Sequence, residues 1–454
     1  MQPSRYLERH ASAEARDPLP SFPPVEHVLT LPLRAEPYEL RSRFATLEGA
    51  SRWLCIAVLN ASASGDEATS NAAWLDAARA EWSLTLLHGT AHPLWLGWRG
   101  KQGLLVVDRS SAGHRLAADE GVGVARKIGC DLALALWQRG QITSPWQHSS
   151  DADTTLPADY FEALAAAEET SVAAIYPFEH LLVGPLTESM ALYELKLRYY
   201  VLGLAAAGSP YAYHSMGSTL AFRSEAYCKA HGMPRLRAGE DFYLLNKLAK
   251  LGPVVRLKHA PLLIDARLSR RVPFGTGPAL LRLQDLRARG ELMPLYHPAA
   301  FELLRLWLEL LQEVAESGET GAYRRLSMHV APEWRSALEG SLRDLGAEEA
   351  LGSACQSTTK AEARAHRLQT WFDAFRSLKF VHLLRHHGLA DLPWRSALSS
   401  ASFLGPELVE AAETGASAES LCAALAALER HQSWPALGLG QTSRRRQRSP
   451  AAEG

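Results

Sequence analysis

Two acidic clusters have the residue types and the spacing needed for chemistry on a hydroxyl or a phosphate. The first, Asp151-Ala152-Asp153, follows the short run Pro145–Ser150 and precedes a helix that opens at Pro157. On an extended segment, residues two apart point the same way, so both carboxylates can face one ligand. A hard divalent cation is commonly held by one or two carboxylates together with substrate phosphates. The purely structural alternative is that Asp151 lies in a turn and that Asp153 is an acid at the N-terminus of the following helix.

The second cluster, Gly239-Glu240-Asp241, stands at the start of a helix predicted over 242–251. The helix dipole stabilises carboxylates at such a position, which is a purely structural reason for them. A carboxylate beside the carboxyl edge of a sheet can also accept a proton from an acceptor hydroxyl. Asp241, with Glu240 beside it, is therefore the candidate catalytic pair.

The elements that must position these clusters form an alternation of strands and helices. Val28–Pro32, Trp53–Asn60 and Gly103–Asp108 are apolar runs that end in polar turns, as parallel strands buried on both faces do. Helical segments separate them, which predicts an α/β fold with a parallel sheet. Ligands of such sheets bind at the carboxyl ends of the strands, so the polar residues there are candidate contacts.

In their order along the chain, these motifs resemble a family 2 glycosyltransferase of the GT-A fold, over about residues 26–275. The end of the first strand, Pro32–Glu36, resembles the nucleotide-binding opening of that family. Ala125–Gly129 (A-R-K-I-G) resembles its A-R-N-x-G stretch, and G-E-D resembles its acid pair on the acceptor side. The resemblance implies a mostly parallel GT-A-like sheet flanked by helices.

The same resemblance implies an inverting, metal-assisted transfer of a sugar from a UDP- or GDP-linked donor to an acceptor hydroxyl. Asp241 would be the general base. Asp153 with Asp151 would hold Mg²⁺ or Mn²⁺, and His259 would complete the metal shell as in some relatives. The candidate contacts to the donor nucleotide are Pro32, Arg34, Glu36, Asn60, Asp108, Arg126, Lys127 and Asp151.

The chain departs from the family pattern at two points. Asn60 ends the second strand where many members have Asp, and Asp108 at the end of the next strand is a competing candidate. The processive signature Q-x-x-R-W is absent, and we expect no transmembrane segment. Both observations favour a soluble, non-processive enzyme.

Composition narrows the classes of partner and the compartment. Among 454 residues, 48 Lys and Arg stand against 49 Asp and Glu, so no global field draws the chain to nucleic acid. The five cysteines are far apart and form no C-x-x-C pair, which is typical of free thiols in a reducing compartment. With an N-terminus that lacks an apolar run, we expect a cytoplasmic protein.

Changes in composition and periodicity along the chain predict four segments. Residues 1–25 are expected to be a disordered tail, 26–290 the GT-A-like domain, 295–435 an all-helical domain and 436–454 a basic disordered tail. Apolar residues at helical spacing, such as Phe301, Leu304, Leu308 and Leu311, form a helix face that must pack against another apolar surface. That partner is the rest of the helical domain, the catalytic domain or a second subunit in a homo-oligomer.

Two other functions are alternatives. A non-catalytic nucleotide-binding scaffold would present the helical domain to a partner. A sugar-1-phosphate nucleotidylyltransferase would need a glycine-rich, arginine-containing phosphate loop after the first strand, whereas the turn here is P-L-R-A-E without glycine. Retention of both D-A-D and G-E-D favours the glycosyltransferase.

Overall fold

The computed structural model describes the whole chain except residues 20, 50, 269–274, 433 and 437–454. It contains two compact units. The first, here the α/β unit, comprises Met1–Leu181 and Ser215–Asp265; the second, here the helical unit, comprises Leu182–His214 and the described residues after Asp265. The α/β class and the helical C-terminal region predicted from the sequence are confirmed. The predicted basic tail lies, from residue 437 on, outside the described residues.

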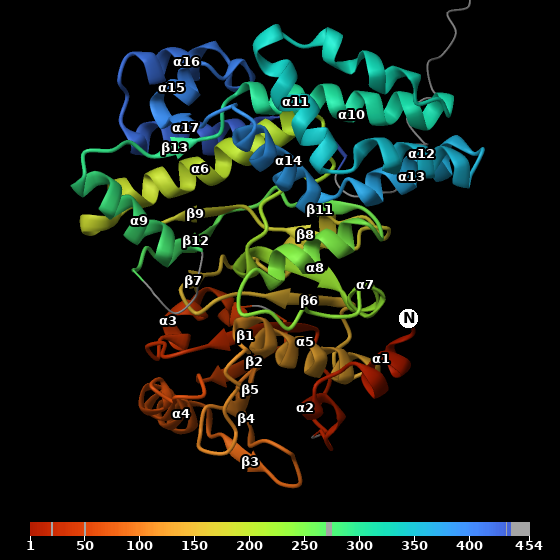
Figure 1. Cartoon of the computed structure of the whole chain (residues 1–454). Coiled ribbons are helices and arrows are strands. Elements are labelled where there is room, and N and C mark those ends of the chain that lie inside the picture. The colour runs from red at the N-terminus through yellow and green to blue at the C-terminus, as the bar shows by residue number, and fades with distance from the viewer. Residues whose placement is uncertain (20, 50, 269–274, 433, 437–454) are drawn as a thin grey trace, which may run out of the picture. The chain divides into compact units, whose positions relative to one another are not determined.

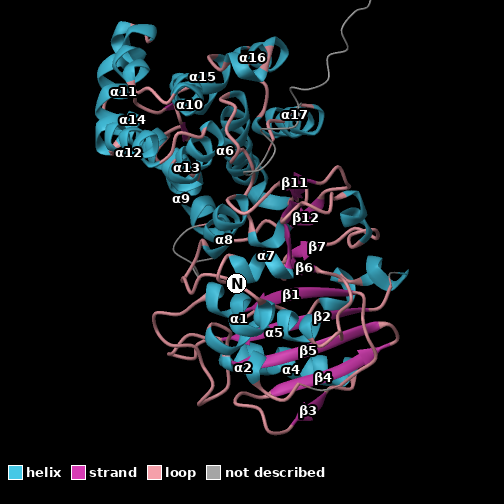
Figure 2. Cartoon of the chain, turned by 90° about the vertical axis from the view of Figure 1, so that its right-hand side faces the viewer, coloured by secondary structure: helices cyan, strands magenta, loops and turns pink. Residues whose placement is uncertain are grey.

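A nine-stranded sheet forms the centre of the α/β unit, in the order β11-β8-β10-β6-β1-β2-β5-β4-β3. Neighbouring strands run parallel except where β10 and β4 are reversed. Figure 2 shows the row of β1, β2, β5 and β4 at the centre of this sheet. The strand bounds are β1 His27–Leu33, β2 Trp53–Asn60, β3 Thr85–Leu87, β4 Leu94–Arg99, β5 Gln102–Arg109, β6 Trp146–Ser149, β8 Ala173–Ile175, β10 Leu220–Arg223 and β11 Val254–Arg256.

The apolar runs of the sequence form the middle of this sheet. Every residue of β1 and β2 is buried, because helices or loops cover both faces of these strands. Helix α5 (Val122–Gln138) packs on β1 and β2, and Gly129 allows the close approach. A Cβ at Gly129 would lie 2.4 Å from Thr30 Cγ2, so a larger residue would push the helix off the strand.

The chain reverses its direction of travel across the sheet beside β1. It runs from β1 to β2 and β5 on one side, then crosses through α5 to β6 on the other side. Strand β6 pairs with β1 only at Leu29 and Thr30. The carboxyl ends of β1 and β6 therefore form a topological switch point, the place where open α/β sheets bind ligands. Ser150 and Asp151 leave β6 at this point.

A small second sheet holds the D-A-D segment. It has the order β7-β12-β9, from Thr154–Thr155, Leu262–Ile264 and Phe178–His180. Strand β7 starts directly after Asp153, and the N–H of Asp265 donates a hydrogen bond of 2.9 Å to the carbonyl of Asp153. Backbone hydrogen bonds therefore fix the position at which the chain leaves the D-A-D segment.

The N-terminal residues differ from the expected disordered tail. They form helices α1 (Pro3–Arg9) and α2 (Ala13–Arg16), which pack on α5 (Figure 1). Tyr6 is fully buried, and its hydroxyl donates to Asp131 Oδ1 at 2.8 Å. The segment is ordered because this one aromatic anchor also satisfies a buried carboxylate.

The helical unit includes one helix that we expected in the GT-A-like domain. Helix α6 (Thr187–Ala206) packs on α17 (Ala418–His431), and Tyr199 contacts Phe301 and Phe403 in a shared core. A buried ion network joins the same two helices: Arg198 donates to Glu194 and Glu429, and His214 Nε2 lies 2.8 Å from Glu429 Oε1. No helix among the described residues is long and apolar enough to cross a membrane.

The remaining elements complete the two units. The α/β unit also has α3 Leu40–Arg43, α4 Ala68–Trp82, α7 Ser224–Lys229 and α8 Glu240–Ala249. The helical unit also has α9 Thr276–Ala288, α10 Ala299–Ser317, α11 Pro332–Asp344, α12 Ala347–Ser357, α13 Ala361–Trp371, α14 Ala374–His386, α15 Trp394–Ser399, α16 Pro406–Glu413 and the two-stranded ribbon of β13 Pro294–Leu295 and β14 Leu392–Pro393.

Candidate active site at the switch point of the sheet

A buried arginine joins the two acidic clusters. Arg126 lies on the first turns of α5, and its side chain is 3% exposed. Its Nη2 donates to Asp151 Oδ1 at 2.8 Å, and its Nε donates to Glu240 Oε1 at 3.0 Å. The structure thus brings D-A-D and G-E-D to the same cation, although they are far apart in the sequence.

The remaining donor group of Arg126 is held by the sheet and by a glycine turn. Nη1 donates to Ser149 Oγ at 2.6 Å and to the Gly217 carbonyl at 3.2 Å, while the Ser149 hydroxyl donates to the same carbonyl at 2.8 Å. A Cβ at Gly217 would lie 2.3 Å from Arg126 Nη2. Only glycine leaves room for the guanidinium, whose burial is balanced by acceptors on each of its nitrogens.

Asp241 is the acid whose titration the site changes most clearly. Helix α8 begins at Glu240 after Gly239, which has a φ of 77°, a conformation that favours glycine. Asp241 is half-buried, and its Oδ1 accepts the N–H of Phe242 at 2.7 Å. Burial and the charge of Glu240 raise the pKa of Asp241 to about 7, against the opposing effect of Arg126. A carboxylate with such a pKa exchanges a proton near neutral pH.

The D-A-D segment is a turn and not the extended segment that the sequence predicted. The N–H of Thr154 donates to the carbonyl of Asp151 at 3.2 Å, which closes a four-residue turn between β6 and β7. The side chain of Asp151 is one-third exposed, and Asp153 is half-buried. Both carboxylates remain accessible, but strand alternation does not align them.

His259 contacts a different acid from the two in D-A-D. Its Nε2 lies 2.8 Å from Asp159 Oδ2. Across the part of the chain that the structure describes, no group of three or more His, Cys, Asp or Glu side chains could hold a metal. The predicted ligand set of Asp151, Asp153 and His259 is therefore not brought together. Carboxylate oxygens are the ligands that Mg²⁺ and Mn²⁺ prefer, so Asp151 and Asp153 are the residues here that could hold such an ion together with substrate phosphates.

The candidate nucleotide contacts on β1, β2 and β5 mainly hold the loops that follow those strands. Arg34 Nε donates to Glu67 Oε1 at 2.7 Å, and the Asn60 amide donates to the Leu33 carbonyl at 2.8 Å. Asp108 Oδ1 accepts two backbone N–H groups, at 2.8 and 2.9 Å, from the two serines that follow Arg109. These contacts shape the carboxyl edge of the sheet.

Pro32, Glu36 and Lys127 have separate surroundings. Pro32 lies inside β1 opposite Val58, and Glu36 is buried just beyond that strand. The Lys127 ammonium donates to Tyr6 and Asp131, at 2.7 and 2.8 Å, on another face of α5 from Arg126. Lys127 thus anchors the N-terminal helices in the structure.

Sequence reasoning missed the roles of Ser149 and Gly217, and it placed Arg126 among the candidate contacts to the donor nucleotide. Two features of the sequence could have indicated this contact: the glycine Gly217 before Ser218-Thr219, and the arginine Arg126 within an amphipathic helix. Neither reveals its partner, because the contacts between α5, β6 and α8 depend on the tertiary path of the chain.

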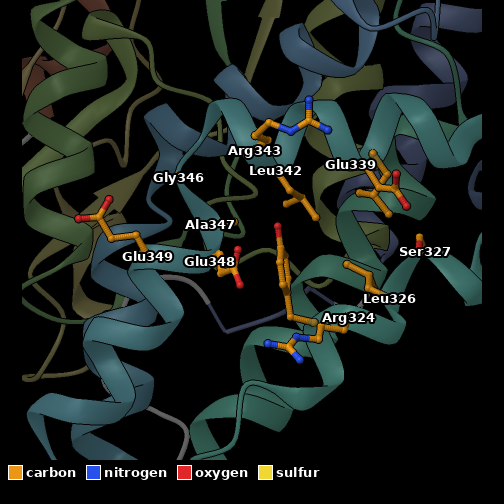
Figure 3. Close-up of a pocket in the computed structure, with 12 residues that line it drawn as sticks. Arg324, Leu326, Ser327, Glu339, Leu342, Arg343, Gly346, Ala347, Glu348 and Glu349 are labelled. Atoms are coloured by element: carbon orange, nitrogen blue, oxygen red, sulfur yellow. The ribbon is translucent and has the colours of Figure 1, made fainter.

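A cleft of about 660 Å³ lies in the helical unit, between the 3₁₀ segment Gly321–His329, α11 and α12 (Figure 3). Leucines form part of its wall, and side chains of both charges surround it. None of the candidate site residues lines it. The lining residues are Tyr323, Arg324, Leu326, Ser327, Leu338, Glu339, Leu342, Arg343, Gly346, Ala347, Glu348 and Glu349.

Comparison with known proteins adds no family assignment. No protein-family model matches the chain, and no curated protein matches its sequence.

Proposed function

We propose that this chain is a glycosyltransferase that moves a sugar from a nucleotide-sugar to an acceptor hydroxyl with inversion. The observation that carries the proposal is the junction of D-A-D and G-E-D on Arg126, at the switch point of a mixed sheet. It agrees with the motif order that resembles family 2 glycosyltransferases of the GT-A fold.

In the proposed reaction, Asp241 is the general base. Its carboxylate takes the proton of the acceptor hydroxyl while the hydroxyl oxygen bonds to the anomeric carbon. The bond from that carbon to the diphosphate oxygen breaks on the opposite face of the sugar, and the nucleoside diphosphate leaves. A pKa of about 7 suits this role, because the ionised base is available at neutral pH and still binds the proton.

Arg126 acts through the carboxylates that it contacts. It is buried, so it is a positioning residue that fixes Asp151 and Glu240 and moderates the pKa of Asp241. A divalent cation bound by Asp153 and Asp151 would stabilise the charge that develops on the leaving diphosphate.

A binding experiment tests the donor half of this proposal. The melting temperature of the full chain is measured with UDP, GDP, CDP and dTDP, each with and without Mn²⁺. At about 100 times the dissociation constant, a ligand stabilises the native state by about 2.7 kcal/mol, a shift of several degrees. Asp153→Asn should abolish the Mn²⁺-dependent part of the shift.

Asp76→Asn is the matched control, because Asp76 is an exposed acid on α4 that pairs with Arg79 on the surface of the same helix. It should leave the shift unchanged. A Mn²⁺-dependent shift that survives in a folded Asp153→Asn variant contradicts the metal assignment. The scaffold alternative predicts the same binding without turnover.

A further inference from the structure

Two histidines outside the candidate site face each other through their ring nitrogens. His92 lies in the connection between β3 and β4, and His114 lies in the loop that follows β5. Strands β4 and β5 are antiparallel neighbours, so this connection and this loop meet at one edge of the sheet (Figure 2). The Nδ1 atoms of the two rings are 3.1 Å apart, and the ring planes are nearly perpendicular, at 82°. The proposed transfer reaction uses neither residue.

The separation of these two nitrogens suits a shared metal ion. A tetrahedral zinc ion binds imidazole nitrogens at about 2.0–2.1 Å, which places two such nitrogens about 3.3 Å apart. The observed distance of 3.1 Å differs from this value by only a few tenths of an ångström. A single proton shared between the two imidazoles gives the same separation. A proton and a metal ion therefore compete for the pair.

A buried carboxylate determines which nitrogen of His92 can bind a metal. The Glu14 side chain on α2 is 1% exposed, and its Oε1 lies 3.8 Å from His92 Nε2. This carboxylate favours a proton on Nε2, which leaves the lone pair on Nδ1. Histidines that bind metals commonly have a carboxylate beside their other ring nitrogen, which fixes the tautomer and the orientation of the ring. Glu14 and His92 have this arrangement.

Further hydrogen bonds hold both histidines in place. Arg109 donates from Nε to the His114 carbonyl and from Nη1 to Glu14 Oε1, each at 2.7 Å. The backbone N–H of Ala91, directly before the other histidine, donates to Asp17 Oδ2 at 2.8 Å. Ligand residues that are held in position before binding lose less conformational freedom when the ligand arrives. The N-terminal segment and the end of β5 therefore preorganise the pair.

The histidine pair is accessible and supplies part of a coordination shell. The His92 side chain is 21% exposed and His114 is half-buried, so a dissolved ion can reach both. Within the described part of the chain, no third His, Cys, Asp or Glu side chain completes a metal-binding group here. Zinc is usually four-coordinate, so an ion on this pair keeps two positions for water or for an added ligand.

We propose that His92 and His114 form a binding site for Zn²⁺ through Nδ1 of each ring. Imidazole nitrogen suits Zn²⁺ and similar transition metals, whereas Mg²⁺ and Mn²⁺ prefer oxygen ligands. The site therefore differs in chemistry from the carboxylates of D-A-D, and it does not depend on the proposed transfer reaction. The ion would join the loop after β5 to the segment before β4.

Calorimetric titration of the untagged full chain with Zn²⁺ tests the site, at a pH of about 7.5, where ordinary imidazoles are neutral. The wild-type chain should bind one ion at this pair. His92→Gln and His114→Gln should each weaken binding at least about tenfold, because each removes one of the two protein ligands. Glu14→Gln should weaken it about tenfold by removing the supporting carboxylate. His329→Gln, a change at an exposed histidine of the helical unit, is the matched control and should keep wild-type affinity.

The loop position of His114 makes its variant the decisive one. Without Zn²⁺, His114→Gln should melt near the wild-type temperature, because the side chain is half-buried in a loop. The proposal is overturned if the wild-type chain does not bind Zn²⁺, or if folded His114→Gln binds it as tightly as the wild type. It is also overturned if His329→Gln weakens binding as much, or if Asp153→Asn and not His114→Gln abolishes it.

Competition between metals separates this site from the proposed donor site. Excess Mg²⁺ should not displace Zn²⁺ from the wild-type chain, because Mg²⁺ prefers oxygen ligands. Displacement by Mg²⁺ would contradict imidazole ligands and overturn the proposal. The zinc site and the transfer reaction can fail separately, because the Zn²⁺ titration needs no nucleotide.

Discussion

Arg126 is the residue on which the candidate site depends most, because its buried guanidinium separates two carboxylates that would otherwise repel each other. Asp151 and Glu240 each accept a hydrogen bond from one nitrogen of Arg126, and the Ser149 hydroxyl accepts one from the third nitrogen. A buried ion pair contributes little net stability as a whole, but removing one partner leaves an uncompensated charge.

We therefore predict that Arg126→Gln is strongly destabilising. The free energy of unfolding, measured with urea, should fall by about 3–5 kcal/mol. Glu240→Gln in the same chain should restore part of the loss, because it removes one unpaired carboxylate. If Arg126→Gln alone changes stability by less than about 0.5 kcal/mol, the cluster is not coupled as described.

Asp241 makes stability depend on pH in a defined direction. Its folded pKa of about 7 lies above the ordinary value of an aspartate, so the folded state holds a proton that the unfolded state has already released. That contribution is fully present below a pH of about 4 and is lost as the pH rises through about 7.

Asp241→Asn cannot titrate, so its stability relative to the wild-type chain should rise between these two pH values. Urea unfolding of both proteins at several pH values measures the difference. A difference that stays flat, or that falls as the pH rises, contradicts a raised pKa at Asp241. Asp76→Asn, a change at an exposed acid, is the control that should show no such trend.

The acidic clusters could be predicted from the sequence at residue scale, but their partners could not. D-A-D and G-E-D stand out by composition and by their place before helices. That Arg126 contacts both, and that His259 contacts Asp159, depends on side chains meeting across separate elements. A single sequence carries no signal for such pairs.

At the scale of elements, continuous apolar runs predicted β1, β2 and β5 correctly, because strands buried on both faces have no polar alternation. The reversed direction of β10 could not be predicted, because a strand of four residues is too short for a pattern that distinguishes parallel from antiparallel neighbours. The N-terminal helices were missed because their buried residues, Tyr6 with Ala11, Glu14 and Ala15, form no apolar run in a polar segment.

The turn at Gly217 gives a prediction at this scale. Gly217→Ala places a Cβ 2.3 Å from Arg126 Nη2, so the guanidinium must move away from the turn. We expect a loss of about 1–3 kcal/mol in unfolding free energy, together with weaker nucleotide binding. Gly352→Ala on α12 is the control: a Cβ there meets no atom within 4 Å, so it should be neutral or stabilising.

Equal stabilities of the Gly217→Ala and wild-type chains would show that the turn does not constrain Arg126. The comparison separates contact with the arginine from the general effect of replacing a glycine, because both variants add the same methyl group.

At the scale of the whole molecule, the place of α6 in the helical unit decides where the chain can be truncated. A chain that ends at Met293 would keep α6 but lose α17 and the core around Tyr199. It would also leave Arg198 without Glu429. We predict that this truncated chain aggregates, as measured by light scattering and dye binding to exposed apolar surface.

Deletion of 182–214 together with the residues after Asp265 respects the unit boundary and should give a more soluble product. Joining residue 181 to residue 215 needs a short flexible linker. If the chain ending at Met293 is monomeric and folded, α6 does not need the C-terminal helices, and the assignment of α6 to the helical unit is wrong.

Release of nucleoside diphosphate from UDP- and GDP-sugars is the reaction that a glycosyltransferase must perform. We expect that the wild-type chain releases it in an acceptor-dependent reaction, and that Asp241→Asn lowers turnover by about 10²–10⁴ while donor binding is nearly intact. Wild-type turnover in the Asp241→Asn variant, or a folded wild-type chain that binds no nucleoside diphosphate with or without Mn²⁺, would contradict the proposed function.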